Sequence, residues 1–300
     1  MTARVVSSVA SQALVYLRLG RVSNLPTVWT NTLAAAVLVG GGVGPVLLPV
    51  WLVVSLFYTG GMYLNDAFDR AFDARRYPDR PIASGAVSAN TVFALGGAQL
   101  VAAVLLAAGI AAARPQVSLI QGPLLAVVLT GAIVYYDARH KTNPVAPFVM
   151  ALCRALVFVL AGALVTAGTP GRLLVGAALM AAYVLGLTYV ARVEQAGRGS
   201  LVAALTLLGL PVAYALSLLL RVDPPVAPVA LFVVWVARAV WLTTRGEGGA
   251  LARVIPMLIA GISLLDAVLI AGVPGHAGTA WFAIGAAALT LGAQRVVPGT

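Results

Sequence analysis

Residues 46–85 read VLLPVWLVVSLFYTGGMYLNDAFDRAFDARRYPDRPIASG and join a long apolar run to a group of acids. Four of the protein's nine acidic residues lie in this stretch. The apolar run leads directly into four side chains that carry oxygen: Asn65, Asp66, Asp69 and Asp73. If the helix continues through them, the i, i+3, i+7 spacing places the three carboxylates within roughly 60° of one another. Phe68 and Phe72 then lie on the opposite face.

Three carboxylates on one helical face repel one another, and each raises the pKa of its neighbours unless a cation holds them together. Oxygen ligands, with the neutral Asn65 carbonyl beside the carboxylates, suit a hard ion. Mg²⁺ typically takes one or two carboxylates together with phosphate oxygens of a substrate. The pattern therefore predicts a Mg²⁺ site and a phosphate-bearing substrate. The alternative is a helix at a membrane surface whose acids pair with Arg70, Arg75 and Arg76.

The composition is that of a polytopic membrane protein. Of the 300 residues, 61% are hydrophobic and 9% charged, and the mean hydropathy is +0.99; soluble domains carry roughly 25% charged residues. A helix needs about 20 apolar residues to cross a bilayer. Long apolar runs predict nine such helices, at about 22–40, 46–65, 88–112, 117–136, 145–167, 170–191, 200–220, 226–243 and 254–272.

A last apolar run, residues 279–293, is short for a span, so the count is nine or ten. The segments are continuously apolar and lack the alternation of a barrel strand. We therefore expect an all-α fold, a polytopic transmembrane helical bundle that forms one domain over residues 1–300.

The net charge of +10 reflects topology rather than a nucleic-acid partner. With the N-terminus in the cytoplasm, most basic residues fall on the inner side, as the positive-inside rule requires. On a nine-helix count the outer basic residues are Arg114, Arg172, Arg221 and Arg295. Arg154 lies within the fifth helix. The expected location is the cell membrane, with the lipid bilayer as a partner.

The dense polar clusters gather at the inner helix ends. Arg80 follows the acids on a short Pro- and Gly-containing loop. The fourth helix ends in a segment with phenols and cations: Tyr135, Tyr136, Arg139 and Lys141. Asn24 and Asn31, seven residues apart in the first helix, either line a cavity or form interhelical hydrogen bonds. Within the membrane, Arg154 can reach a substrate phosphate or a neighbouring acid, and Asp266 faces water or pairs locally.

The pattern N-D-x-x-D-x-x-x-D at residues 65–73, followed by R-P-I-x-S-G at residues 80–85, resembles the UbiA superfamily of intramembrane prenyltransferases. The resemblance implies a helical bundle around a central cavity and Mg²⁺ held by two Asp-rich motifs. It also implies transfer of an isoprenoid from its diphosphate to a lipophilic acceptor. On this resemblance the first motif holds Mg²⁺ and Lys141 contacts the diphosphate.

The second motif, normally D-x-x-D-x-x-x-D after the sixth helix, departs from the family. Its three positions read Ala191, Glu194 and Arg198, so one carboxylate remains as a metal ligand. Arg192 or Arg198 can replace the missing metal with fixed positive charge. This departure resembles the divergent EboC-like branch of the superfamily.

These observations predict a Mg²⁺-dependent transferase that moves a prenyl group from a prenyl diphosphate to a lipophilic, in one reading aromatic, acceptor. The alternative is a non-catalytic isoprenoid or lipid carrier of the same fold; an ion-coupled transporter is less favoured because the acids cluster at a helix end. The expected catalytic residues are Asp66, Asp69 and Asp73. The expected metal ligands are Asn65, Asp66, Asp69, Asp73 and Glu194. The expected diphosphate-binding residues are Arg80, Arg139, Lys141, Arg154 and Arg198. The expected substrate-cavity residues are Asn24, Asn31, Tyr135 and Tyr136.

Overall fold

A computed structural model describes residues 12–141, 143–196, 200–245 and 250–299, and for residues 193–196 and 250–252 the backbone alone. The described chain is helical throughout and contains no strand. Two short 3-10 helices are η1 (Val22–Asn24) and η2 (Leu218–Leu220). The α-helices are α2 (Leu25–Leu38), α3 (Leu47–Arg76), α4 (Ala89–Ala113), α5 (Gln121–Arg139), α6 (Ala146–Val165), α7 (Gly171–Ala196), α8 (Leu201–Ser217), α9 (Val226–Arg245), α10 (Ala250–Ala271) and α11 (Ala277–Gln294).

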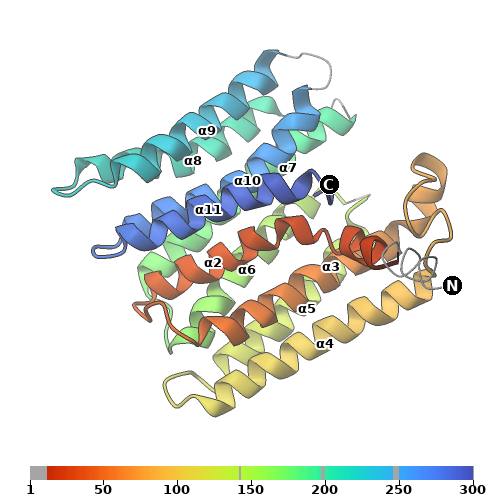
Figure 1. The fold of residues 1–300 in the computed structure, drawn as a ribbon, viewed down its shortest axis with the longest axis horizontal. Coiled ribbons are helices and arrows are strands. Elements are labelled where there is room, and N and C mark those ends of the chain that lie inside the picture. Colours follow the sequence, from red (N-terminus) through yellow and green to blue (C-terminus); the bar gives the residue numbers. More distant parts are fainter. Residues whose placement is uncertain (1–11, 142, 197–199, 246–249, 300) are drawn as a thin grey trace, which may run out of the picture.

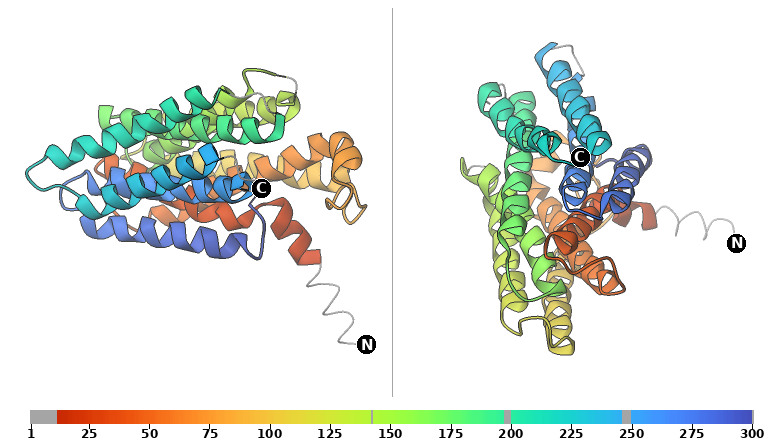
Figure 2. Two further views of the ribbon diagram at one scale, coloured as in Figure 1. Left: turned by 90° about the horizontal axis from the view of Figure 1, so that it is seen from above. Right: turned by 90° about the vertical axis from the view of Figure 1, so that its left-hand side faces the viewer.

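The helices form a bundle in which α2 is the most enclosed element. They run along the longest axis of the molecule (Figure 1), and the turned views show that they pack in more than one layer (Figure 2). Of the 14 residues of α2, 12 are buried, and the helix packs against α3, α6, α10 and α11. The small side chains of residues 34–36 are fully buried, and such residues let neighbouring helices approach closely.

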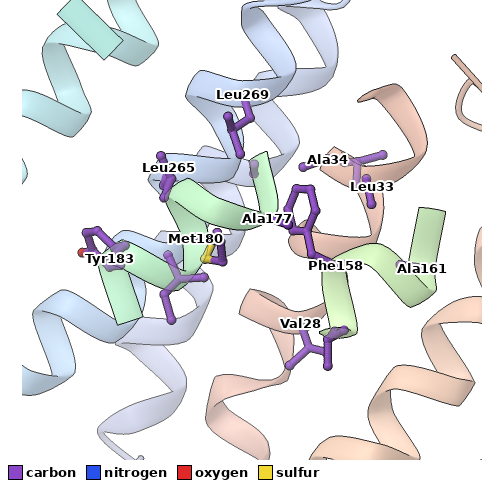
Figure 3. Close-up of a cluster of buried hydrophobic side chains, with 14 of the residues drawn as sticks. Val28, Leu33, Ala34, Phe158, Ala161, Ala177, Met180, Tyr183, Leu265 and Leu269 are labelled. Atoms are coloured by element: carbon purple, nitrogen blue, oxygen red, sulfur yellow. The ribbon is translucent and has the colours of Figure 1, made fainter. Parts of the chain in front are cut away.

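The packing around α2 is apolar over most of its length. In Figure 3, Val28 and Leu33 of α2 lie near Phe158 of α6, while Met180 of α7 and Leu265 of α10 complete the cluster. In a membrane this close packing stabilises the bundle through van der Waals contact, since lipid tails are as apolar as the side chains.

Helix α3 carries the acidic motif as a continuous helix. It runs past the predicted end at residue 65 to Arg76, because no helix-breaking residue intervenes before Pro78. Tyr77 leaves the helical conformation at φ −139°, as the ring of a following proline favours. The expectation that the helix continues through the acids is confirmed.

The bundle contains ten long helices in its described part, because the run at residues 279–293 forms α11. Gln294 at the end of α11 donates to Asn24, beside the start of α2. Arg295 therefore lies on the same side as Arg21 and the acids, and its assignment to the outer side on a nine-helix count is wrong. Seven described helices are long and apolar enough to cross a membrane, so the chain is an integral, multi-pass membrane protein.

Helices α3 and α4 meet at two glycines, and this contact predicts a stability effect. A methyl group at Gly96 would lie 2.9 Å from Leu64 Cγ and 3.0 Å from the Gly60 carbonyl oxygen. Gly96→Ala is therefore expected to lower the free energy of unfolding by about 1–3 kcal/mol through overpacking. The neighbouring Gly97, with no atom within 4 Å of an added Cβ, is the matched control. Thermal unfolding in detergent measures both, and equal melting temperatures would contradict the prediction.

Candidate active site

The three carboxylates of the first motif lie together on the buried face of α3. Asp66, Asp69 and Asp73 are 9%, 5% and 3% exposed, whereas Phe68 and Phe72 are 36% and 40% exposed. The predicted arrangement of acids on one face and rings on the other is confirmed. The three carboxylates thus lie on the buried face of the last three turns of α3.

Each carboxylate is paired with a basic side chain from a different segment. Arg21, before α2, places Nη2 3.0 Å from Asp66 Oδ1. Lys141, after α5, places Nζ 2.8 Å from Asp69 Oδ2, and Arg80, in the α3–α4 loop, places Nη1 2.8 Å from Asp73 Oδ2. We call Asp66, Asp69, Asp73, Arg21, Arg80 and Lys141 the charged cluster. The tertiary fold thus neutralises three acids that the helix alone would leave in repulsion.

The arginines that follow the acids along α3 make other contacts. Arg70 donates to the carbonyl of Ala67 at 3.0 Å and lies over the Phe93 ring. Arg75 donates to the carbonyl of Ala71 at 3.2 Å. The alternative expectation of ion pairs within this helix is therefore wrong for the partners that the structure describes. The acids are buried, whereas these arginines are exposed.

Arg21 was not singled out as a site residue by the sequence, and its backbone is unusual. Its φ of 43° makes it the one non-glycine residue with positive φ in the described chain. Such a conformation costs on the order of 1–3 kcal/mol and persists where the surroundings enforce it. The carbonyl of Arg21 accepts from the Asn24 amide at 3.0 Å, while its side chain reaches Asp66. Arg21 is the last charged residue before the first long apolar run, three residues before Asn24. That position is the sequence feature that could have identified it as a site residue.

Arg80 is held in its charged form. Burial lowers the pKa of its guanidinium, but the hydrogen bond to Asp73 and the negative charges of Asp66 and Asp69 outweigh that effect, so the pKa lies above its ordinary value. The guanidinium also lies 4.8 Å from the centroid of the Tyr77 ring, within the range of a cation–π interaction. The loop therefore presents a permanent positive charge beside the acids.

Lys141 and His140 both approach Asp69 from the end of α5. The Nε2 atom of His140 lies 3.4 Å from Asp69 Oδ2, and its ring stacks on Tyr136 with centroids 5.0 Å apart. Lys141 lies 4.2 Å from the centroid of the Phe72 ring. The predicted placement of Lys141 beside the first motif is therefore seen, and His140, which was not predicted as a site residue, lies beside the same carboxylate.

Asn65 contacts a further acid that was not predicted as a site residue. Its Nδ2 donates to Asp137 Oδ1 at 3.1 Å, and Asp137 is 4% exposed. Asp137 Oδ2 and Asp73 Oδ1 are buried without a hydrogen-bond partner. An acid that directly follows two tyrosines at the end of an apolar helix was the signal that could have identified Asp137.

Of the other residues predicted at the end of α5, one lies in the site and two do not. Tyr136 stacks within the site, but Tyr135 is 50% exposed and its hydroxyl accepts from Asn143 at 3.0 Å. Arg139 is exposed and forms no ion pair with a described acid. Tyr135 and Arg139 thus point away from the charged cluster.

The predicted residues of α2 and α6 lie deeper in the bundle. Asn24 holds the C-terminal segment, donating to the Gly299 carbonyl at 2.9 Å. Asn31 donates to Asp266 Oδ2 at 2.7 Å, which confirms the interhelical hydrogen bonding expected as one of two alternatives. Arg154 donates to Thr27 Oγ1 at 2.7 Å and does not contact the charged cluster.

The second motif is described in part. Ala191 and Arg192 lie in the last turns of α7, and Arg192 donates to the Asn143 carbonyl at 3.4 Å. The Glu194 side chain and all of Arg198 lie outside the described residues. Their predicted roles as metal ligand and diphosphate contact stay predictions.

The first motif offers the donor set that a hard divalent cation prefers. The oxygens of Asn65 and the three carboxylates share one helix face, and the unpartnered Asp73 Oδ1 is free to accept a cation. Within the described ranges, no three His, Cys, Asp or Glu side chains converge into a complete metal cage. Mg²⁺ typically binds through one or two carboxylates and takes its other ligands from substrate phosphates and water.

A small cavity of ≈ 110 Å³ lies beside the charged cluster. Its walls include Arg21, Asp66, Arg80, Pro81 and Pro298. Drug-sized ligands occupy sites of roughly 300–1,000 Å³. The cavity is therefore smaller than a typical site for a drug-sized ligand.

Residues 24–262 match the sequence model of the UbiA prenyltransferase family. The mitochondrial 4-hydroxybenzoate polyprenyltransferase of Rattus norvegicus is 37% identical over 107 residues, which are 33% of this chain and 29% of the relative. The digeranylgeranylglyceryl phosphate synthase of Methanoculleus marisnigri is 31% identical over 130 residues, or 43% of this chain and 44% of the relative. The chain thus spans less than half the length of these curated relatives.

Two solved structures share the fold. A structure from work on digeranylgeranylglyceryl phosphate synthase in membranes superposes with a TM-score of 0.63 at 18% identity, over 88% of this chain and 99% of the other. A UbiA homologue from Aeropyrum pernix K1 in its apo form gives 0.63 at 18% identity, over 83% and 96%. At this identity the likeness establishes the helical architecture.

Proposed function

Because this chain belongs to the UbiA prenyltransferase family, we propose that it transfers the prenyl group of a prenyl diphosphate to a lipophilic acceptor within the membrane. Mg²⁺ is the proposed cofactor. The N-terminus is proposed to lie in the cytoplasm, since the basic residues concentrate at the end of the bundle that holds the acids. The membrane in question is the cell membrane.

The observation that carries the proposal is the charged cluster. Three carboxylates on one helix face meet three basic side chains from separate segments, within 3.0 Å in each pair. A Mg²⁺–diphosphate group offers a counter-charge to both sets at once, because the metal suits the acids and the phosphate oxygens suit the cations. The cluster is thus complementary to a metal diphosphate rather than to either ion alone.

Asp66, Asp69, Asp73 and Asn65 would hold Mg²⁺, with Glu194 as the proposed ligand from the second motif. When bound, the ion neutralises the negative charge that develops on the departing diphosphate. Arg80 and Lys141, released from their carboxylates, donate to diphosphate oxygens. Arg21 is positioned to do the same from the other side of the motif.

The reaction breaks the bond between the first prenyl carbon and the diphosphate oxygen, and the electron pair leaves with the diphosphate. An acceptor atom supplies the pair for the new bond and loses its proton. Tyr136, which lies against His140, offers an aromatic face that stabilises a carbocation.

The second candidate function is a carrier that binds the isoprenoid without transferring it. Ala191, at the first position of the altered second motif, provides no carboxylate. If one metal is lost with it, the leaving diphosphate is less stabilised and turnover slows or stops. A carrier would bind the same diphosphate at the same cluster.

The test incubates the purified full chain with labelled prenyl diphosphates of several lengths, Mg²⁺ and a membrane extract as the source of acceptors. A labelled lipophilic product and released diphosphate are expected. Diphosphate that binds without forming any product would support the carrier. If diphosphate does not bind with or without Mg²⁺, both candidate functions are excluded.

Glu194→Gln tests whether the second motif still serves a metal. The amide keeps a carbonyl oxygen but loses the charge, so we expect the Mg²⁺ concentration for half-maximal diphosphate release to rise about tenfold, as for the loss of a charged interaction of about 1.4 kcal/mol. Gln195→Ala is the control on the same turn. An unchanged Mg²⁺ response in Glu194→Gln would remove Glu194 from the site, and a larger loss in Arg198→Ala would assign the role to that arginine.

A further inference from the structure

A polar stripe leads from the charged cluster into the middle of the bundle. Asn24, Thr27 and Asn31 recur every three or four residues along η1 and α2, which places them on one side, and Arg21 directly precedes η1. Thr27 Oγ1 donates to the Asn24 carbonyl at 2.7 Å. At a rise of about 1.5 Å per residue, Asn31 lies roughly 10 Å further along the helix than Asn24. The stripe therefore reaches well below the level of the acids.

The stripe ends in a second group of polar side chains, which we call the core polar cluster: Thr27, Thr30, Asn31, Arg154, Ser263 and Asp266. Thr27 is 1% exposed, and Thr30, Asn31, Ser263 and Asp266 are fully buried. They come from α2, α6 and α10, so the contacts join three helices. An ionisable residue within a membrane bundle carries a cost of several kcal/mol by general estimates and often marks a functional site.

The hydrogen bonds of the core polar cluster leave specific atoms without partners. Thr30 is satisfied by Ser263 at 3.0 Å and by the Thr27 carbonyl at 3.1 Å. Asn31 Nδ2 donates a hydrogen bond to Asp266 Oδ2. The Oδ1 atom of each of these two residues is buried without a partner. The Nε atom of Arg154 is likewise buried and unpartnered.

The unpartnered atoms indicate which chemical groups a ligand would need in order to bind here. Asn31 Oδ1 and Asp266 Oδ1 accept hydrogen bonds, so they call for O–H donors. Arg154 Nε donates, so it calls for an oxygen acceptor. A hydroxyl compound supplies both, whereas a deprotonated anionic oxygen has no proton to donate to the two unpartnered oxygens. Buried polar groups in native proteins nearly always have partners, which indicates that a ligand completes this set.

We infer that the core polar cluster binds the hydroxyl groups of the acceptor, and that this acceptor is an uncharged alcohol or phenol with at least two hydroxyls. The inference rests on the proposed transfer function. It places the acceptor beside α2, deeper than the diphosphate. Arg154 then serves the acceptor rather than the diphosphate.

The test uses the full chain with Asp266→Asn and Arg154→Gln, each with Thr32→Val as control. Thr32 is fully buried in the same helix, and its hydroxyl contacts the Val28 carbonyl of its own helix at 3.2 Å. A membrane extract is separated by anion exchange into neutral and anionic fractions. Each fraction, together with hydroquinone and myo-inositol as neutral probes and 4-hydroxybenzoate and glycerol 1-phosphate as anionic probes, is offered with a labelled prenyl diphosphate.

We expect product from the neutral fraction, and an acceptor KM about tenfold higher in Asp266→Asn and Arg154→Gln but unchanged in Thr32→Val, as for the loss of one hydrogen bond to a charged group. The Kd for prenyl diphosphate, measured by calorimetry, should stay unchanged in all three. Product from the anionic fraction alone, or an unchanged KM in both cluster variants, overturns the inference. Bound diphosphate with no product from either fraction overturns it too and favours the carrier. Failure to bind diphosphate refutes the proposed function itself.

If either substitution prevents folding, Asn31→Asp provides a second route. It keeps the size of the side chain but places a second acid beside Asp266, so the neutral acceptor should bind more weakly. A folded Asn31→Asp variant with unchanged acceptor KM and unchanged preference for the neutral fraction also overturns the inference.

Discussion

Asp69→Ala is expected to lower prenyl transfer by roughly 10²–10³-fold, the loss typical when a group that stabilises transition-state charge is removed. Asp69 lies at the middle of the charged cluster, and its carboxylate is 2.8 Å from Lys141 Nζ. No neutral group beside it can replace the charge toward a metal. Asp66→Ala should have an effect of the same order. Single-turnover diphosphate release at saturating Mg²⁺ measures both.

The protein should remain folded in Asp69→Ala. The Lys141 side chain that loses its partner is 41% exposed, so it can turn to water without leaving a buried charge. Asp79→Ala is the matched control, because Asp79 lies exposed in the loop that follows the motif. Wild-type transfer by an inserted Asp69→Ala protein would rule out the metal assignment. Equal losses in Asp69→Ala and Asp79→Ala would point to a general effect of charge.

Lys141→Ala and Arg80→Ala are each expected to raise the Kd for prenyl diphosphate by about 10–100-fold, which corresponds to a charge-assisted hydrogen bond of roughly 1.5–3 kcal/mol. Both side chains now neutralise carboxylates of the charged cluster, and both are proposed to transfer to diphosphate oxygens. Calorimetric titration in the presence of Mg²⁺ measures the change.

Arg139→Ala is the control for Lys141→Ala. Arg139 is a basic residue two positions earlier that the sequence also predicts as a diphosphate ligand, yet it is exposed and apart from the acids. Its replacement should alter the Kd less than about twofold, as for most exposed charges. If Arg139→Ala weakens binding as much as Lys141→Ala, long-range attraction rather than direct contact explains the effect. Repeating the titration at high salt separates the two, because salt screens exposed charges more strongly.

Local spacing was sufficient to predict the arrangement within α3. The i, i+3, i+7 positions of Asp66, Asp69 and Asp73 lie on one face of any α-helix, since covalent geometry sets about 100° per residue. The hydropathy of the long runs likewise predicted most of the helices, because the bilayer excludes unpaired backbone groups. These features depend on neighbours in the chain, and the sequence contains them directly.

The number of helices was less certain for a physical reason. Residues 279–293 are too short to identify a span by length alone, and the helix is recognised because α11 packs against α10 and α2. That packing returns Gln294 to Asn24, 270 residues earlier in the chain. Hydropathy describes a segment's preference for lipid, whereas packing against other helices determines whether a marginal segment folds as a helix of the bundle.

The sequence by itself determined the membrane character, the helical class and the grouping of acids on α3. Only the tertiary structure decided which cations neutralise those acids, with Arg21 lying 45 residues from Asp66 in the chain. It also decided that Asp266 meets Asn31, 235 residues away, rather than facing water. Such pairs depend on how helices pack against one another, and charge, size and hydropathy along the chain do not specify that packing.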